Sequence, residues 1–219
     1  MIPSAIFACC VILAATSLCR SALASDCRTA IGIEPAQAQG SVGLIFDGCG
    51  QTFTALDTLV ASLTLWRVAS QDSSWLIGLR PWFMMTDSTG KPDTRHLLYE
   101  GTALVIPDGD GVNPIEFRWD FDPPVSLPGP GKYAFFVFRD PCFAYIDLIS
   151  KRSEGGSAYP GGEYWSTHRT FACVPYKYMN SIPDVDLGFK IEFCSDQTTP
   201  VSRSTWGGVK ARYRPMPIE

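Results

Sequence analysis

The chain has 219 residues, of which 46% are hydrophobic and 18% charged, and its formal net charge at pH 7 is −4. A mildly acidic surface does not attract phosphate backbones, so the charge argues against nucleic acid as a partner. The length is ample for a single all-β domain with a substantial core.

The N-terminus has the pattern of a targeting signal. Ala5 to Leu18 is an almost unbroken apolar run, and the small-x-small sequence Ala22-Leu23-Ala24 follows it. We therefore expect residues 1–24 to be a signal peptide and the mature protein to be secreted, extracellular or at the cell surface. No later segment approaches the roughly 20 apolar residues of a membrane-spanning helix, so we expect no membrane insertion after cleavage.

Alternation of apolar and polar residues predicts strands along the rest of the chain. Its period of two is that of a strand with one buried face. The regular examples are Leu59–Leu65, Ile115–Phe121 and Val185–Phe193. Less regular candidates are Val42–Phe46, Gln51–Thr54, Trp75–Met84, His96–Ile106, Lys132–Arg139 and Phe143–Ile149.

The last of the regular runs shows the pattern most clearly. Val185, Leu187, Phe189, Ile191 and Phe193 share one parity, and Asp186, Gly188, Lys190 and Glu192 share the other. The first set is expected to face a core and the second set to face solvent, because successive side chains of a strand point to opposite faces.

The connections between these strands are rich in Gly, Pro, Asp and Ser, as in Pro128-Gly129-Pro130-Gly131. Many short strands with such turns, and no long segment of helical period, predict an all-β fold, a two-sheet antiparallel sandwich of jelly-roll type. We expect it to span residues 25–194 and to be stabilised by disulfides. Pro81, inside one candidate strand, indicates an edge position or a bulge.

Five cysteines follow the predicted signal peptide, and in an exported protein they are first interpreted as disulfide partners. The preferred pairs are Cys27 with Cys49 and Cys142 with Cys173. Cys194 would then be free or intermolecular. The spacing does not fix the connectivity, and Cys27 with Cys194 is nearly as plausible.

The C-terminal residues 195–219 differ from the domain before them. A polar Ser/Thr stretch leads into Trp206-Gly207-Gly208-Val209-Lys210-Ala211-Arg212-Tyr213-Arg214, a basic and aromatic sequence. We interpret this region as a linker and tail that either docks on the sandwich or serves as an attachment signal.

Catalytic motifs are absent from the sequence. Neither His96 nor His168 belongs to a nucleophile elbow, a His-Glu-x-x-His sequence or a zinc-deaminase pattern. We therefore expect no enzyme, although a carboxylate pair assembled by the fold, as in glycoside hydrolases, stays open.

A sugar site is the more attractive functional hypothesis. A glycine-rich segment carries three aromatic rings that could stack on a pyranose, with polar side chains near them in sequence. The residues of this candidate site are Tyr159, Glu163, Tyr164, Trp165, His168 and Asp140. A structural role is the favoured interpretation, because aromatic side chains at sandwich corners often cover the core.

Asp108, Asp110 and Asn113 could offer oxygens to calcium, but their spacing is not that of an EF-hand. A plain acidic turn is the favoured interpretation. We expect no cofactor, and a structural calcium assembled from distant loops stays open.

Four segments carry a family resemblance: Gln51–Ala55, Val125–Gly129 leading into Tyr133, Tyr159–Gly162 and Asp186–Phe189. Together they resemble a β-sandwich module of exported bacterial proteins, similar to jelly-roll carbohydrate-binding and galactose-binding-like domains. The resemblance spans roughly residues 50–193 and implies the fold more than an activity. It leads us to expect a non-catalytic binding or adhesion module for a glycan or a cell-surface partner. The alternatives are a structural component held by its tail and by Cys194, and a glycoside hydrolase.

Overall fold

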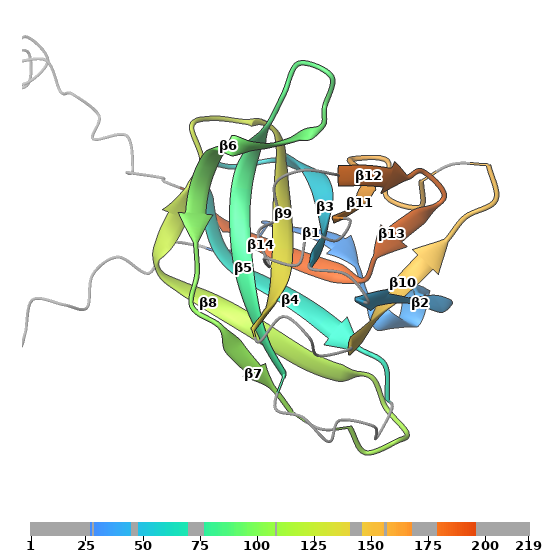
Figure 1. Ribbon diagram of the computed structural model, residues 1–219. Helices are drawn as coiled ribbons and strands as arrows, with labels where there is room; N and C mark the ends of the chain where they lie inside the picture. Colours follow the sequence, from blue (N-terminus) through green and yellow to red (C-terminus); the bar gives the residue numbers. More distant parts are fainter. Residues whose placement is uncertain are drawn as a thin grey trace, which may run out of the picture.

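Two antiparallel β-sheets pack face to face in the computed structural model. The structure describes Cys27 and residues 29–44, 48–69, 77–107, 109–140, 146–155, 157–167 and 179–195. In Figure 1, β5 and β9 of one sheet run upright in front of β4 and β8 of the other, which slant behind them. The two-sheet sandwich expected from the sequence is thereby confirmed.

The first sheet joins the two ends of the described chain. Its strand path is β1-β14-β4-β10-β13, with β8 paired to β4 and β2 paired to β10. A short 3₁₀ helix, η1 (Pro35–Gln37), connects β1 to β2. The strands are β1 (Thr29–Ile33), β2 (Gly40–Leu44), β4 (Leu59–Arg67), β8 (Ile115–Ser126), β10 (Ile146–Arg152), β13 (Val185–Leu187) and β14 (Phe189–Cys194).

The second sheet is built mainly from the middle of the chain. Its strand path is β12-β11-β3-β9-β5-β6, and β7 pairs with β5 beyond the end of β6. The strands are β3 (Gly48–Ala55), β5 (Ile77–Thr86), β6 (Pro92–Glu100), β7 (Leu104–Ile106), β9 (Gly131–Asp140), β11 (Tyr164–Thr167) and β12 (Met179–Ile182).

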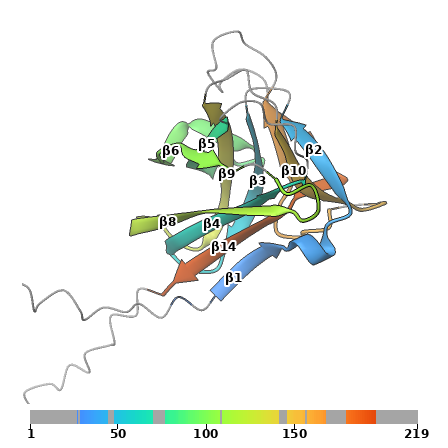
Figure 2. The ribbon, with the colours of Figure 1, turned by 90° about the horizontal axis from the view of Figure 1, so that it is seen from below.

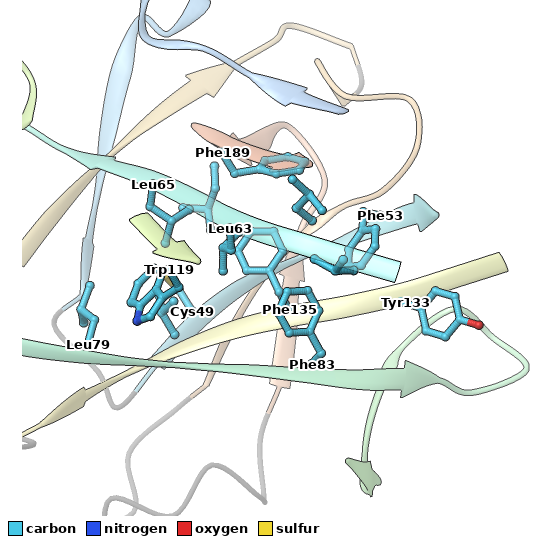
Figure 3. Packing of buried hydrophobic residues seen from close by; sticks show 14 of the residues in the cluster. Cys49, Phe53, Leu63, Leu65, Leu79, Phe83, Trp119, Tyr133, Phe135 and Phe189 are labelled. Carbon is cyan, nitrogen blue, oxygen red and sulfur yellow. The ribbon is translucent and has the colours of Figure 1, made fainter. Parts of the chain in front are cut away.

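The main hydrophobic core lies between the two sheets and is rich in aromatic rings. Phe53 of β3 is central: its ring lies 6.1 Å from that of Phe83 and 6.3 Å from that of Phe135. The first sheet contributes Leu63, Leu65 and Phe189, as Figure 3 shows. Burial of such side chains is the principal term that stabilises a sandwich.

The alternation at residues 185–193 correctly identifies the core face. All five apolar residues of that run belong to the core between the sheets. The run is two strands, however, because β13 pairs with β10 whereas β14 pairs with β1 and β4. Asp186 also departs from the expectation, since this residue predicted to face solvent is fully buried.

Two other strand predictions need correction in detail. The single candidate His96–Ile106 is β6 followed by β7. Pro81 lies within β5, where the neighbouring strand changes from β6 to β7, and its carbonyl accepts a hydrogen bond from the amide of Gly101. A proline is tolerated there because the missing amide hydrogen faces the gap between two short neighbours.

The preferred pairing of Cys27 with Cys49 is wrong. Cys27 forms a disulfide with Cys194, and Cys49 is a buried free thiol on β3. The strand register explains this pairing. Thr29 of β1 lies opposite Phe193 of β14, which brings Cys27 close to Cys194. Figure 2 shows β1 and β14 side by side. Cys194 is therefore not available for an intermolecular bond while this disulfide is intact.

The predicted Cys142–Cys173 disulfide, the signal peptide and the tail lie outside the described residues. Within the described part of the chain, no helix is both long and apolar enough to cross a lipid bilayer.

Candidate functional site: the outer face of the second sheet

A second cluster of buried apolar residues lies on the second sheet, on the face turned away from the core. We call it the outer aromatic face. It arises because residues such as Phe136 and Phe138 alternate along β9 with core residues such as Phe135 and Val137. Its members are Trp82, Met84, Ala134, Phe136, Phe138, Trp165 and Met179.

One row of this face crosses five strands. Trp165 of β11 is opposite Gly50 of β3, Gly50 is opposite Phe136 of β9, and Phe136 is opposite Trp82 of β5. The row ends at Glu100 of β6, which pairs with Trp82. The side chains of the row therefore project from the same side of the sheet.

Glycines in β3 allow the rings to lie close to the sheet. A side chain at Gly50 would collide with the ring of Phe136, and one at Gly48 would collide with the ring of Phe138. The two phenylalanine rings are stacked, with centroids 5.8 Å apart, and Trp82 packs on Phe138 at 4.8 Å. Aromatic rings that cover cross-strand glycines in this way fill the space left by the missing side chains.

A charged group borders these rings, and we call it the charged rim. Arg80, opposite Phe138 on β9, donates to Glu100 from Nη1 and to Asp140 from Nη2, each at 3.0 Å. All three side chains are substantially exposed. The hydrogen bond with Glu100, and secondarily the bond and charge of Asp140, raise the pKa of Arg80. The rim therefore presents a cation between two carboxylates.

Trp165 has an unsatisfied polar atom. Its indole Nε1 is buried without a hydrogen-bond partner among the described residues, and the residue as a whole is 9% exposed. Buried N–H groups are normally paired, and none of the described residues supplies a partner for this one.

The structure divides the predicted sugar site. Trp165 and Asp140 lie on the outer face of the second sheet, but Tyr164 points into the core, where it is buried. Tyr159 packs its ring edge-on against Phe189, with centroids 5.2 Å apart. Glu163 is half-buried, and His168 lies outside the described residues. The prediction of exposed aromatic rings in one loop is therefore wrong for Tyr164 and Trp165, which are buried residues of β11.

The glycine-rich segment has the structural role that was favoured. Its backbone is held against β3, because Thr52 donates its amide to the Glu163 carbonyl at 2.9 Å. Glu163 returns an amide hydrogen bond to Thr52 Oγ1 at 2.8 Å. Thr54 Oγ1 also donates to the carbonyl of Gly161. These bonds hold residues 157–163, which we call the corner loop, against β3.

Cys49 and Tyr164 form a hydrogen-bonded pair inside the sandwich. Burial raises the pKa of the Cys49 thiol to about 12, against smaller opposing effects of Tyr164 and Arg139. Burial also raises the pKa of Tyr164. A neutral, enclosed thiol is a poor nucleophile, because the thiolate is the reactive form.

We predict that Cys49 resists alkylation in the folded protein at about pH 8 and reacts when the chain is unfolded, where a thiol titrates near 8.5. Because the folded thiol keeps its proton to about pH 12, stability should fall as the pH rises above about 9. Iodoacetamide labelling, read by mass spectrometry of the Cys49 peptide with and without urea, tests this. Equal labelling in both conditions would contradict the buried thiol.

The predicted acidic loop is a capped turn. Asp110 Oδ1 accepts amide hydrogen bonds from Val112 and Asn113, each at 2.8 Å, and Asn113 Nδ2 donates to the other carboxylate oxygen. Asn113 therefore turns its donor, not its oxygen, toward Asp110. Asp108 lies outside the described residues, and among those described no cluster of three His, Cys, Asp or Glu could hold a metal ion.

His96 lies on β6 with its Nδ1 2.7 Å from Oδ2 of Asp93. His96 is exposed whereas the Asp93 side chain is mostly covered, and no serine or cysteine is hydrogen-bonded to this pair in the described contacts. Among the described residues, no nucleophile is therefore hydrogen-bonded to this His–Asp pair.

Sequence reasoning missed Arg80, Trp82, Phe136, Phe138 and Glu100. A signal for two of them was present: Tyr133 to Phe138 is an uninterrupted apolar run, which indicates a strand buried on both faces. Pairing of Trp82 with Phe136 and Glu100 depends on the strand order, which the local pattern does not contain.

Comparisons with known proteins give no indication of function, so the function is argued from the geometry described above. No family model matches the chain, and no curated protein or solved structure matches it either. The resemblance to carbohydrate-binding modules therefore stays a prediction.

Proposed function

We propose that this chain is a secreted, non-catalytic binding module that recognises a glycan at the charged rim of the outer aromatic face. The observation that carries the proposal is the juxtaposition of Arg80, Glu100 and Asp140 with Trp82 and Phe138 on one face of one sheet. The apolar N-terminal run and the Cys27–Cys194 disulfide support an extracellular location.

The chemistry suits a sugar because it combines polar and apolar contacts. Carboxylates and a guanidinium offer acceptors and donors to hydroxyl groups, and aromatic surface packs against sugar C–H groups. The exposed parts of Trp82, Phe138 and Trp165 are only 7–9% of each residue. The polar rim would therefore supply most contacts, with ring edges beside them.

A glycan-array screen followed by calorimetry tests the proposal. We expect Arg80→Ala to weaken glycan binding at least tenfold, because it removes the donor and releases both carboxylates. Trp165→Phe should weaken binding less, because it removes only the indole N–H while keeping an aromatic ring.

The other sheet offers a matched control. Arg118 bonds Asp120 from Nε at 2.6 Å and Glu192 from Nη2 at 2.8 Å, in an exposed network like that of Arg80. Arg118→Ala removes a comparable ion-pair network and should leave binding unchanged. The proposal fails when the wild type binds no glycan, or when the two arginine variants lose binding equally.

A further inference from the structure

One edge of the first sheet is unpaired. β8 pairs with β4 along one side, and no other described strand pairs with it. Figure 2 shows β8, β4, β14 and β1 across the sheet in this order. An edge strand leaves backbone N–H and C=O groups without a strand partner, which makes it a template for a further strand. This edge is separate from the outer aromatic face, which belongs to the second sheet.

β8 has an acidic side and an apolar side. Its exposed residues of one parity are three acids and one base: Glu116, Arg118, Asp120 and Asp122. The base is already engaged, because Arg118 forms ion pairs with Asp120 and Glu192. The other parity consists of core residues: Phe117, Trp119 and Phe121. A strand that complements this edge would therefore have one basic side and one apolar side.

The C-terminal tail contains a segment of that kind. Residues 209–214 alternate between apolar side chains, Val209, Ala211 and Tyr213, and basic ones, Lys210, Arg212 and Arg214. This period of two is that of a strand with one apolar face. Gly207-Gly208 precedes the segment and Pro215 follows it, and such residues commonly bound strands. A segment of this length is an ordinary strand, so it suits the 12-residue edge in length as well as in pattern.

The described chain ends where such a strand would begin. Cys194, the last residue of β14, lies opposite Leu59 of β4, and Leu59 lies opposite Ser126, the last residue of β8. β14 and β8 are both antiparallel to β4, so they finish at the same end of the sheet. A chain that turns back after β14 therefore runs antiparallel to β8. Three strand spacings, roughly 14 Å, separate β14 from a strand beyond β8, and residues 195–208 can span a much longer distance.

We propose that residues 209–214 pair with the free edge of β8 in the same molecule, as an added antiparallel strand of the first sheet. The basic side chains then project from the same face as the carboxylates of β8, where opposite charges on neighbouring strands stabilise the pairing. The apolar side chains project toward the core side. They meet apolar surface there, because half-buried Tyr99 of the facing strand β6 packs on Phe121 with ring centroids 5.2 Å apart.

The primary test is amide hydrogen exchange of the full mature protein, followed residue by residue by NMR. Amides of residues 209–214 should exchange at least tenfold more slowly than those of a free peptide of the same sequence, because strand pairing protects them. The amides of β8 that point away from β4 should be protected as well. Tail amides that exchange at the rate of the free peptide overturn the proposal.

A proline variant shows where the tail pairs. Ala211→Pro removes an amide and interrupts the strand without changing charge, so it should abolish protection of the tail and speed exchange at the free side of β8 at least tenfold. Thr198→Pro, in the connection, is the matched control and should leave both unchanged. An Ala211→Pro variant with unaltered exchange in β8 overturns the proposal. So does protection that rises with protein concentration alongside dimers in light scattering, since the tail would then pair with a second copy.

A charge variant tests the complementarity. Arg212→Glu should reduce protection of the tail by roughly threefold, because it places an acid beside the acidic side of β8. Arg203→Glu makes the same change of charge in the connection and should have no effect. Protection in the wild type should also fall in about 1 M salt, which screens exposed charges. Equal effects of the two substitutions would contradict pairing of the basic residues with β8.

Discussion

Replacement of Cys27 and Cys194 with serine should lower the free energy of unfolding by roughly 3–5 kcal/mol. The two residues are 167 positions apart in sequence, so the bond closes almost the entire described domain. Its loss increases the conformational entropy of the unfolded chain and removes the covalent link between the start of β1 and the end of β14. Urea denaturation of the variant and the wild type, followed by tryptophan fluorescence, measures the difference.

Either single serine variant should cost nearly as much as the double variant, since breaking the bond needs only one substitution. Peptide mapping of the native protein should recover Cys27 linked to Cys194. A Cys27–Cys49 peptide, or a double variant as stable as the wild type, would contradict the structure. Without this bond β1 is held by its pairing with β14 and by the packing of Ile31 and Ile33 against the core, so amide exchange in this edge strand should rise most.

The strands were predictable because their periodicity is local. Leu59–Leu65 and Ile115–Phe121 alternate clearly, and both became paired strands of the first sheet, β4 and β8. β1, β11 and β12 were missed. β11 is only four residues long, and its side chains are polar as well as aromatic, so no period of two can be established over it.

The candidate site was harder to predict, because it depends on which strands become neighbours. Trp165 and Asp140 were selected for their nearness in sequence to other aromatic and polar groups. The structure places them on one face for a different reason, the pairing of β11 with β3 and of β3 with β9. Parity also separates Tyr164 from Trp165, since adjacent residues of a strand point to opposite faces.

Asp186 shows the limit of polarity patterns. Its position in the alternating run predicted that its side chain faces solvent. The same prediction is only partly correct for Lys190 and Glu192, whose side chains are half-buried and form an ion pair with each other. At Asp186 the corner loop covers the strand and supplies Ser157 and Tyr159 as partners. A local pattern does not reveal a segment that folds back about 30 residues away, so the buried carboxylate could be found only in three dimensions.

That same corner loop gives the second large prediction, in which Gly162→Ala should destabilise the protein by about 3–5 kcal/mol. A Cβ at Gly162 would lie 1.6 Å from the Thr52 carbonyl oxygen and 2.3 Å from its carbon. Backbone atoms of a central strand cannot rotate away, so the loop must move off β3. That movement breaks the hydrogen bonds between Thr52 and Glu163. Chemical denaturation gives the loss directly.

Gly129→Ala is the matched control. A Cβ at Gly129 meets nothing within 4 Å, and the residue lies half-buried in a turn between two exposed prolines. The substitution should be neutral or stabilise by about 0.4–1 kcal/mol, because alanine restricts the unfolded chain. The contrast separates two effects: the loss of conformational entropy that a Gly→Ala substitution causes in the unfolded chain, and the clash between a Cβ at position 162 and the backbone of β3. Equal effects of the two substitutions would mean that the corner loop does not pack on β3.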